Sequence, residues 1–323
     1  MITGMSDIEK RVLMELQYNF PLVSKPFDVV AKRLGTSVDE IIDVVKKMKE
    51  LGILKRIGFY VNYKSYRQVA ALVAFRTDEP EKLANEILKN FTTTHSYIRN
   101  HPYYNLWVVV RDKNKEALKN KIEKLATQSK ADFVILWSKR VYRLSVKYDL
   151  EKGVSRAGPF SKIVENPPSP SELGLDINLV RALRVLPLKR EPYKELATKY
   201  GLDEERLVEI AKMLLEKGVL GDPGAALDGH RAGFTYNAMV VMKPATKEAE
   251  LCKWIIDNVP EATHVVLREP WPPEKWRHNC YMMVHAVGET RLRPVYEKLD
   301  ESPYVKDYLQ IISLRDLLPG IIR

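Results

Sequence analysis

Histidine and arginine recur together at two places in this sequence, at a spacing that could bind and protonate an acidic ligand. His95 precedes Arg99 by four residues, and His264 precedes Arg268 by the same interval. Residues an even number of positions apart share one face of a β-strand, so each histidine would point the same way as its arginine. Imidazole transfers protons near neutral pH, and guanidinium groups bind carboxylates through paired hydrogen bonds. The two pairs therefore predict an acid–base site for a ligand that carries carboxylates.

Further histidines and several aromatic residues lie near these pairs in the sequence. Taken singly, a histidine on a strand is more often a hydrogen-bonded structural residue than a functional one. The recurrence of the pair favours a functional interpretation, because the side chains around it differ between the two places. The other histidines are His101, His230, His278 and His285, and the neighbouring aromatic and amide side chains are Tyr97, Tyr104, Asn105, Trp107, Trp276 and Asn279.

Several common kinds of site are absent from the sequence. It has no zinc-ligand spacing, no glycine-rich phosphate or dinucleotide loop and no nucleophile elbow. Its two cysteines, Cys252 and Cys280, do not form a metal-binding pair, and we expect no disulfide between them in a cytosolic protein. These absences argue against many common classes of enzyme.

Charge and hydropathy narrow the choice of partners. The formal net charge is +10, which fits nucleic acid, an anionic membrane surface or a polyanionic small molecule. The sequence shows neither a signal peptide nor an apolar stretch as long as a membrane span. We therefore expect a soluble, cytoplasmic protein with no membrane partner.

The elements that must position the histidines occur twice, because the chain is a tandem duplication. Pro21 and Pro187 are 166 positions apart, and Gly35 and Gly201 have the same separation. A repeat of this kind defines the architecture before any local pattern does. It predicts a winged helix-turn-helix over 1–56, a ferredoxin-like domain over 57–150, a linker over 151–175, a second winged helix-turn-helix over 176–222 and a second ferredoxin-like domain over 223–323.

Each predicted winged helix-turn-helix consists of three helices followed by a strand. In the first copy Pro26 suits the start of the second helix, and Gly35 suits its end. Ser37 and Glu40 form a capping box at the start of the third helix, and Asp203 takes the capping position in the second copy. This order of elements is typical of the winged helix-turn-helix motif.

A βαββαβ pattern follows each helix-turn-helix. Strands are predicted over 69–76, 94–99, 106–111 and 132–138, and again over 238–243, 262–268, 281–286 and 305–313. Helices are predicted over 81–91, 115–128, 248–258 and 291–299. The order is typical of a ferredoxin-like sandwich, with helices on one face of the sheet and the other face open. The predicted fold class is α+β, and the proline-rich segment 151–175 should be partly extended and partly flexible.

The order of domains resembles the Lrp/AsnC feast-famine regulators, which makes DNA binding one interpretation. In that arrangement the start of the third helix meets bases and phosphates. Here that stretch carries Asp39 and Glu40 in one copy and Asp203-Glu204-Glu205 in the other. Carboxylates are repelled by phosphate, although acids at this place also stabilise a helix N-terminus. We therefore expect that the helix-turn-helix units serve in packing and that DNA is not a partner.

A narrower resemblance covers nearly the whole chain apart from the linker. The segments Arg56-Ile-Gly-Phe, Thr94-His-Ser-Tyr-Ile-Arg-Asn-His and Tyr104-Asn-Leu-Trp resemble the first subunit type of the siroheme decarboxylases. The segment that begins His230-Arg-Ala-Gly-Phe, together with Thr263-His264, Arg268, His278-Asn279 and His285, is similar to the second subunit type. Two related subunits pair in that family, so the resemblance implies an intramolecular pseudo-heterodimer of two AsnC-type domains.

The second copy departs from the first at two matched positions. Val266 stands where the first copy has Tyr97, and His278 stands where it has Tyr104. An aromatic hydroxyl is therefore missing from one copy. The departure leaves open whether both copies carry a working pocket.

The resemblance implies a carboxy-lyase that converts siroheme to 12,18-didecarboxysiroheme by removing two acetate carboxyl groups in haem biosynthesis. The residues it implies for proton transfer or for ligation of the substrate iron are His95, His101, His264 and His278. The residues it implies for binding the macrocycle and its carboxylates are Tyr97, Arg99, Tyr104, Asn105, Trp107, His230, Arg231, Arg268, Trp276, Asn279 and His285.

The implied partner is siroheme or a related iron tetrapyrrole, which brings its own iron, so we expect no separate cofactor and no further metal site. Two alternatives stay open at this point: an Lrp/AsnC-type transcription regulator, and a non-catalytic haem-sensing module. The sequence also leaves open whether the product enters an alternative route to haem or the route to d-type haem.

Overall fold

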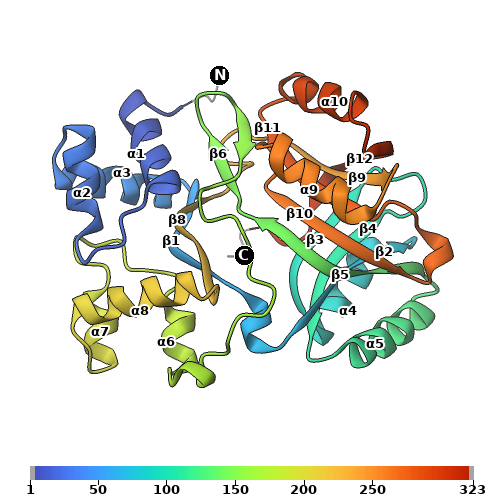
Figure 1. Ribbon diagram of the computed structural model, residues 1–323, viewed down its shortest axis with the longest axis horizontal. Coiled ribbons are helices and arrows are strands. Elements are labelled where there is room, and N and C mark those ends of the chain that lie inside the picture. The colour runs from blue at the N-terminus through green and yellow to red at the C-terminus, as the bar shows by residue number, and fades with distance from the viewer. Residues whose placement is uncertain (1–3, 320–323) are drawn as a thin grey trace.

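The computed structural model describes residues 4–319 of the chain (Figure 1). Each copy begins with three helices and a strand, as the sequence predicts. The first copy has α1 (Asp7–Tyr18), α2 (Pro26–Leu34), α3 (Val38–Glu50) and β1 (Leu54–Val61), and the second has α6 (Ile177–Ala182), α7 (Lys194–Lys199), α8 (Glu204–Glu216) and β8 (Leu220–Leu227).

Capping side chains set where these helices begin. The Ser6 hydroxyl accepts from the backbone N–H of Glu9, and the Glu9 carboxylate accepts from the N–H of Ser6, which forms a capping box at α1. Asp203 caps α8 by accepting from the backbone N–H of Arg206 at 2.7 Å. Gly35 follows α2 in the left-handed conformation, at φ 69°. The predicted caps at Gly35 and Asp203 are thus confirmed. The capping box predicted at the start of α3 is only half formed: the Ser37 hydroxyl accepts from the backbone N–H of Glu40 at 3.1 Å, but the Glu40 carboxylate accepts from the Thr36 hydroxyl instead.

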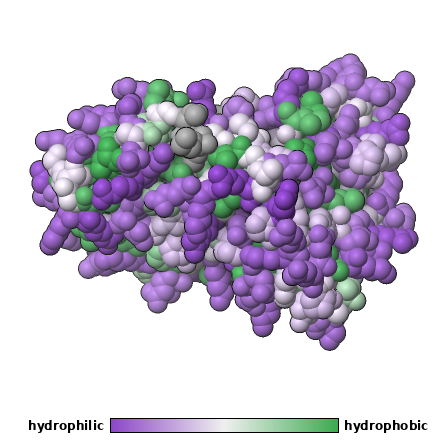
Figure 2. Space-filling view, turned by 90° about the horizontal axis from the view of Figure 1, so that it is seen from above, coloured by the Kyte–Doolittle hydropathy of each residue, from purple (hydrophilic) through white to green (hydrophobic). Residues whose placement is uncertain are grey.

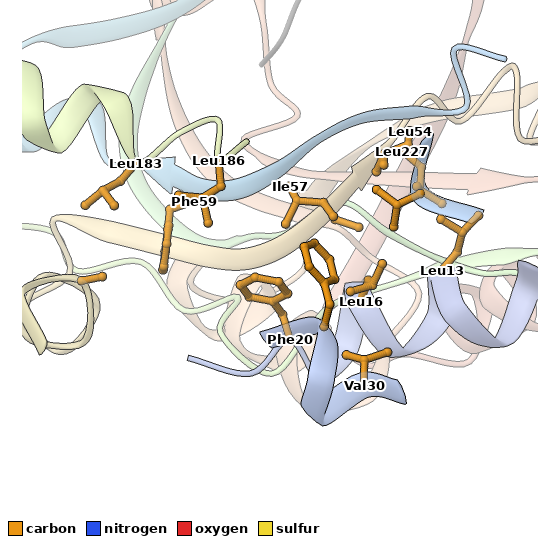
Figure 3. Close-up of a cluster of buried hydrophobic side chains, with 14 of the residues drawn as sticks. Leu13, Leu16, Phe20, Val30, Leu54, Ile57, Phe59, Leu183, Leu186 and Leu227 are labelled. Atoms are coloured by element: carbon orange, nitrogen blue, oxygen red, sulfur yellow. The ribbon is translucent and has the colours of Figure 1, made fainter. Parts of the chain in front are cut away.

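The strands that end the two helix-turn-helix units pair with each other in one antiparallel ribbon. In this ribbon, β1 and β8, each strand packs on the first helix of the other copy. The backbone N–H of Phe59 in β1 donates to the carbonyl of Leu183, just after α6, at 3.0 Å. Conversely, a Cβ on Gly224 of β8 would lie 2.2 Å from the Leu16 carbonyl of α1. Figure 3 shows the shared core that results: side chains of both copies lie along the ribbon, from Leu183 and Phe59 at one end to Leu13 and Leu227 at the other.

Eight further strands form a closed ring. Their order is β10-β5-β2-β4-β3-β12-β9-β11, and pairing of β10 with β11 closes it. The members from the first copy are β2 (Val69–Arg76), β3 (Thr92–Arg99), β4 (Leu106–Asp112) and β5 (Asp132–Leu144). The members from the second copy are β9 (Tyr236–Pro244), β10 (His264–Trp271), β11 (Cys280–Ala286) and β12 (Val305–Asp316). The two copies therefore join at two seams, β3–β12 and β5–β10.

Four helices cover the outside of the ring. They are α4 (Pro80–Asn90), α5 (Lys115–Gln128), α9 (Glu248–Asn258) and α10 (Arg293–Asp300). Alternate residues on each strand face these helices: Val73 and Phe75 of β2 pack beneath them, whereas Leu72 and Ala74 face the interior. The sheet face that we expected to be open is therefore not exposed, because the two uncovered faces turn toward each other inside the ring.

The segment predicted as a linker is packed against both copies. It contains the strand β7 (Val154–Arg156), which pairs with β6 (Lys147–Asp149) and meets β11 at Ala286. Ile163 in the same segment is buried. Short 3₁₀ turns complete the structure at η1 (Tyr63–Tyr66), η2 (Ser171–Leu173), η3 (Pro273–Lys275) and η4 (Glu289–Leu292). The expected boundary after residue 56 falls within β1.

The expectation about the cysteines is wrong. Cys252 of α9 and Cys280 of β11 form a disulfide, with Cα atoms 5.9 Å apart. Both residues are fully buried in the core between the second copy's sheet and its helices. Sequence separation could not show this proximity, because it arises only when α9 packs on the sheet.

The surface is mostly polar on the face that Figure 2 presents, with hydrophobic residues scattered over it. Within residues 4–319, none of the helices has both the length and the apolar character that a membrane crossing requires.

Candidate active site

A cavity of about 1530 Å³ extends from the interior of the ring to the β1–β8 ribbon and α6. Pockets for drug-sized ligands usually measure ~300–1,000 Å³, so this one has room for a macrocycle. Nine of the expected site residues line it: His95, Tyr97, Arg99, Trp107, His230, Arg231, His264, Arg268 and His285. The ring therefore gathers residues from both copies around one space.

The two central histidines meet inside this cavity. His95 comes from β3 and His264 from β10, which occupy opposite positions in the ring. Their imidazole centroids are 6.4 Å apart, in an edge-to-face arrangement. The Nδ1 atom of His95 lies 3.0 Å from the Thr94 hydroxyl, and that of His264 lies 3.2 Å from the Thr263 hydroxyl. Both rings are thus oriented through Nδ1 by the threonine that precedes each histidine.

Arg99 and Arg268 are turned toward the seams. Arg99 donates to the carbonyl of Ile311 in β12 at 3.1 Å. Arg268 donates to the carbonyl of Leu136 and to the hydroxyl of Ser138 in β5, both at 3.1 Å. Burial lowers the pKa of Arg268, with the neighbouring tyrosines opposing that shift. We expected both arginines to clamp the ligand, but each one also fastens its own copy to the last strand of the other.

The cavity wall is strongly cationic. Its charged side chains comprise nine cations and three carboxylates. The cations are Lys55, Arg56, Arg99, Arg111, Arg181, Arg184, Arg231, Arg268 and Arg315, and the carboxylates are Asp222, Asp228 and Asp316. Positive charge confined between low-dielectric walls attracts anionic ligands. The predicted preference for a ligand with carboxylates therefore has a physical basis in this wall.

His101 and His278 lie apart from the cavity. They belong to an aromatic group at the end of the ring, where the His101 ring is 5.4 Å from Trp276 and 5.6 Å from Tyr104. Trp107 contacts this group and also lines the cavity, with its ring 5.8 Å from His101. Burial lowers the pKa of His101, and His278 lowers it further. The four histidines expected to act together are thus divided by a wall of tryptophan and tyrosine.

Both expected asparagines lie outside the cavity, where their side chains bind other parts of the protein. Asn105 accepts from the backbone N–H of Thr77 at 3.1 Å and donates to the carbonyl of Thr77 at 2.7 Å. Asn279 donates to the carboxylate of Glu248 at the start of α9. The Asn105 side chain thus joins the end of β2 to the start of β4, whereas the Asn279 side chain joins the start of β11 to α9.

Three further expected site residues line the cavity near the β1–β8 ribbon, namely Arg231, His285 and His230. Arg231 lies across Gly52, and its Nη1 atom donates to the carbonyl of Leu51 at 3.4 Å. His285 is buried, with its ring 5.7 Å from that of Tyr148. His230 also lines this side of the cavity.

Sequence reasoning missed several polar side chains that line the cavity. Arg111 of β4 stacks its guanidinium over the Tyr63 ring at 4.6 Å, and Arg56 of β1 also faces the cavity. Arg111 lies four residues after Trp107, so strand alternation could have placed both on one face. Arg56 opens one of the segments that carry the family resemblance, but the sequence did not place Arg56 or Tyr63 at the cavity, because the position of the β1–β8 ribbon over the ring depends on tertiary packing. Among residues 4–319, no three His, Cys, Asp or Glu side chains come together as a metal-ion site.

Comparison with known protein families identifies both kinds of domain. The model of the AsnC-like ligand-binding domain matches residues 67–143 and 231–317. The model of the siroheme decarboxylase NirDL-like HTH domain matches residues 9–54 and 176–220. Together these matches reproduce the duplication that the sequence shows.

Similar proteins match either nearly the whole chain or about half of it. Siroheme decarboxylase of Hydrogenobacter thermophilus is 26% identical over 310 residues, which is 95% of this chain and 91% of that protein. The siroheme decarboxylase beta subunit of Methanosarcina barkeri is 29% identical over 143 residues, or 44% of this chain and 92% of the subunit. A crystal structure of the siroheme decarboxylase NirDL with an iron-uroporphyrin III analogue shares the fold, with a TM-score of 0.63 at 24% identity over 95% of this chain and 91% of that one.

Proposed function

The chain belongs to the AsnC-like siroheme decarboxylases, in the form that joins both subunit types in one polypeptide, and we propose that it converts siroheme to 12,18-didecarboxysiroheme by removing two acetate carboxyl groups. The observation that supports this best is the pair His95 and His264, which face each other inside a cationic cavity large enough for a tetrapyrrole. The cavity is shared by both copies, so we propose that both carboxyl groups are lost at one site.

The proposed chemistry needs carbon dioxide to leave and a proton to arrive. The bond between the acetate methylene and its carboxyl group breaks, and the electron pair stays on the methylene carbon, where the adjacent pyrrole delocalises it. The imidazolium of His95 or His264 then protonates that carbon through Nε2, which produces a methyl group. A positioned acid of this kind typically accelerates a reaction by ~10²–10⁴-fold. The iron belongs to the substrate, and the cationic wall neutralises carboxylates that remain.

Tryptophan and tyrosine complete the proposed binding site. Trp107 closes the cavity toward the aromatic group, and Tyr97 lies beside His95 with ring centroids 6.3 Å apart. Flat apolar walls suit a macrocycle and limit the access of water. We leave His101 and His278 out of the proposed chemistry, because Trp107 and Trp276 separate them from the cavity.

We also propose that each copy is a winged helix-turn-helix followed by a ferredoxin-like unit. Within each copy the strands run in the spatial order fourth, first, third, second, which gives β5-β2-β4-β3 and β12-β9-β11-β10. Two helices on one face of such a sheet make a ferredoxin-like sandwich.

The same arrangement supports the inference that DNA is not a partner. The wing strands are occupied in the ribbon, where Ile57 and Phe59 are buried between the copies. The exposed start of α3 presents Asp39 and Glu40. A regulator would show salt-sensitive binding to duplex DNA, and we expect none. The cytoplasmic location and the lack of a separate cofactor stay predictions, and so does the choice between the two haem routes.

Mass spectrometry after anaerobic incubation with siroheme tests the assignment. The expected product is lighter than siroheme by two molecules of carbon dioxide. A haem-sensing module would instead bind the tetrapyrrole and return it intact. Unchanged siroheme mass, with the protein folded and the ligand bound, would exclude the decarboxylase and favour the sensor.

A further inference from the structure

Arg56 is a buried cation, and two of its three guanidinium nitrogens have no hydrogen-bond partner in the described part of the chain. It lies on β1, lines the cavity and is only 5% exposed. Its Nε and Nη1 atoms have no partner among residues 4–319. Burial lowers the pKa of Arg56 to about 10, and Arg184 adds to that effect while Asp222 opposes it. The guanidinium is therefore still charged at neutral pH, at a position where an unpaired charge costs stability.

The matching position of the second copy has the opposite charge and is fully engaged. Asp222 follows Arg56 by 166 residues, the interval that also separates Pro21 from Pro187. The Asp222 carboxylate accepts from the Ser145 hydroxyl at 2.7 Å and lies 3.4 Å from Nζ of the buried Lys147. The backbone N–H of Gly158, from the linker, donates to the same hydroxyl at 2.9 Å. On the linker side of the ribbon, the negative charge of Asp222 is thus balanced by the positive charge of Lys147.

The two halves of the cavity share their central histidine and arginine positions and carry opposite charges at these two wing residues. His95 corresponds to His264 and Arg99 corresponds to Arg268, so the interior is close to twofold symmetric. A flat ligand edged with carboxylates could enter such a space in two orientations related by that symmetry. The unsatisfied guanidinium on one side favours the orientation that brings a carboxylate to it.

We propose that Arg56 binds a carboxylate of the tetrapyrrole substrate and thereby fixes which edge of the macrocycle faces the β1–β8 ribbon. The inference rests on the proposed function and names a binding residue within that site. A carboxylate with its edge on the guanidinium would supply the partner that Nε and Nη1 lack, through two parallel hydrogen bonds. Arg99 and Arg268 are less suited to this selection, because they occur in both copies and fasten the seams.

Binding of iron uroporphyrin III, a carboxylate-rich porphyrin, provides the test. Titration followed by the Soret absorbance should show ~10–100-fold weaker binding for Arg56→Gln, as expected for the loss of a charged hydrogen bond. Arg190→Gln is the matched control, since Arg190 pairs with Asp28 at the surface, away from the cavity. It removes the same charge and should bind like the wild type. Arg56→Lys keeps the charge without the paired geometry and should fall between them.

Two further measurements separate an anchor from a structural residue. The ligand-free Arg56→Gln protein should melt at the wild-type temperature or above it, because the substitution removes an unpaired buried charge. Proton NMR of the bound ferric porphyrin should show one set of ring signals for the wild type and two sets for Arg56→Gln, one for each orientation. Equal affinity and a single set of signals in the variant would overturn the inference, and so would a large loss of stability without ligand.

Failure of this inference can be told apart from failure of the proposed function. If the wild type decarboxylates siroheme while Arg56→Gln binds porphyrin as tightly, the function stands and the anchor is rejected. If the wild type returns siroheme unchanged while porphyrin binding depends on Arg56, the anchor stands and the decarboxylase assignment is rejected.

Discussion

His95 and His264 occupy corresponding places in the two copies and face each other inside the ring, with imidazole centroids 6.4 Å apart. Each ring is held at Nδ1 by the threonine that precedes it. Duplication has therefore placed two copies of one histidine-bearing strand around a single space. We propose that both decarboxylation steps use these two histidines as their acid groups.

Replacing either histidine should impair both steps. We expect His95→Gln and His264→Gln each to lower the rate of carbon dioxide release by ~10²–10⁴-fold, the usual contribution of a general acid. Single-turnover mass spectrometry would measure this rate, and porphyrin affinity serves as the control for folding. Two independent pockets predict a different result, in which each single variant keeps about half of the activity.

Replacing a seam arginine should weaken the ring. Arg268→Ala leaves the carbonyl of Leu136 and the hydroxyl of Ser138 without their donor. We therefore expect the free energy of unfolding to fall by ~1–3 kcal/mol. Arg140→Ala is the control, because Arg140 lies on the same seam opposite Leu267 but is exposed. Urea denaturation should show a lower midpoint for the first variant alone. Equal midpoints would mean that the seam does not depend on Arg268.

A side chain at Gly224 should separate the ribbon from α1. Its backbone has φ +107°, and a Cβ would lie 2.2 Å from the Leu16 carbonyl, which is main chain and cannot rotate away. The backbone conformation alone costs ~1–3 kcal/mol for other residues, so Gly224→Ala should lower the melting temperature clearly. Gly221→Ala in the same strand is the matched control, since its Cβ would meet only Tyr60 at 3.6 Å. Similar melting temperatures for the two variants would contradict the close packing of β8 on α1.

Acid should destabilise the protein through His101. Because burial lowers its pKa in the folded state, the unfolded chain binds a proton more readily. The stability that results is fully present above the ordinary pKa of ~6.5 and is lost as the pH falls below it. His101→Asn keeps an acceptor for the N–H groups of Tyr103 and Tyr104 but cannot titrate. As the pH is lowered from 7.5 to 5.5, the melting temperature should therefore fall less steeply for this variant than for the wild type.

Much of the local structure could be predicted from the sequence. The helix from Lys115 to Gln128 and the strand from Val69 to Arg76 appear with the expected bounds, because periodicity and caps are local signals. The pairing of His95 with Arg99 on one strand follows from alternation in the same way. Residues separated by few positions are thus well described by local rules.

The contacts between copies could not be predicted. His101 lies six residues after His95, yet Trp107 stands between it and the cavity, because the turn after β3 leads out of the ring. Arg56 reaches the cavity only because its strand crosses to the other copy. Such placements depend on how sheets close and ribbons pack, and neither composition nor spacing carries that information.

The β1–β8 ribbon bears on how this protein could have evolved and on whether its two copies can be separated. The strands β1 and β8 each complete the helical core of the other copy, so we expect neither copy to keep its fold by itself. Separately made subunits have to find an unlike partner, and like subunits can compete for the same position. Tethering sets the ratio at one to one and keeps the local concentration of the partner high at any dilution. Cutting the chain within 151–175 should therefore yield two fragments that stay together in the native state and do not refold when purified apart.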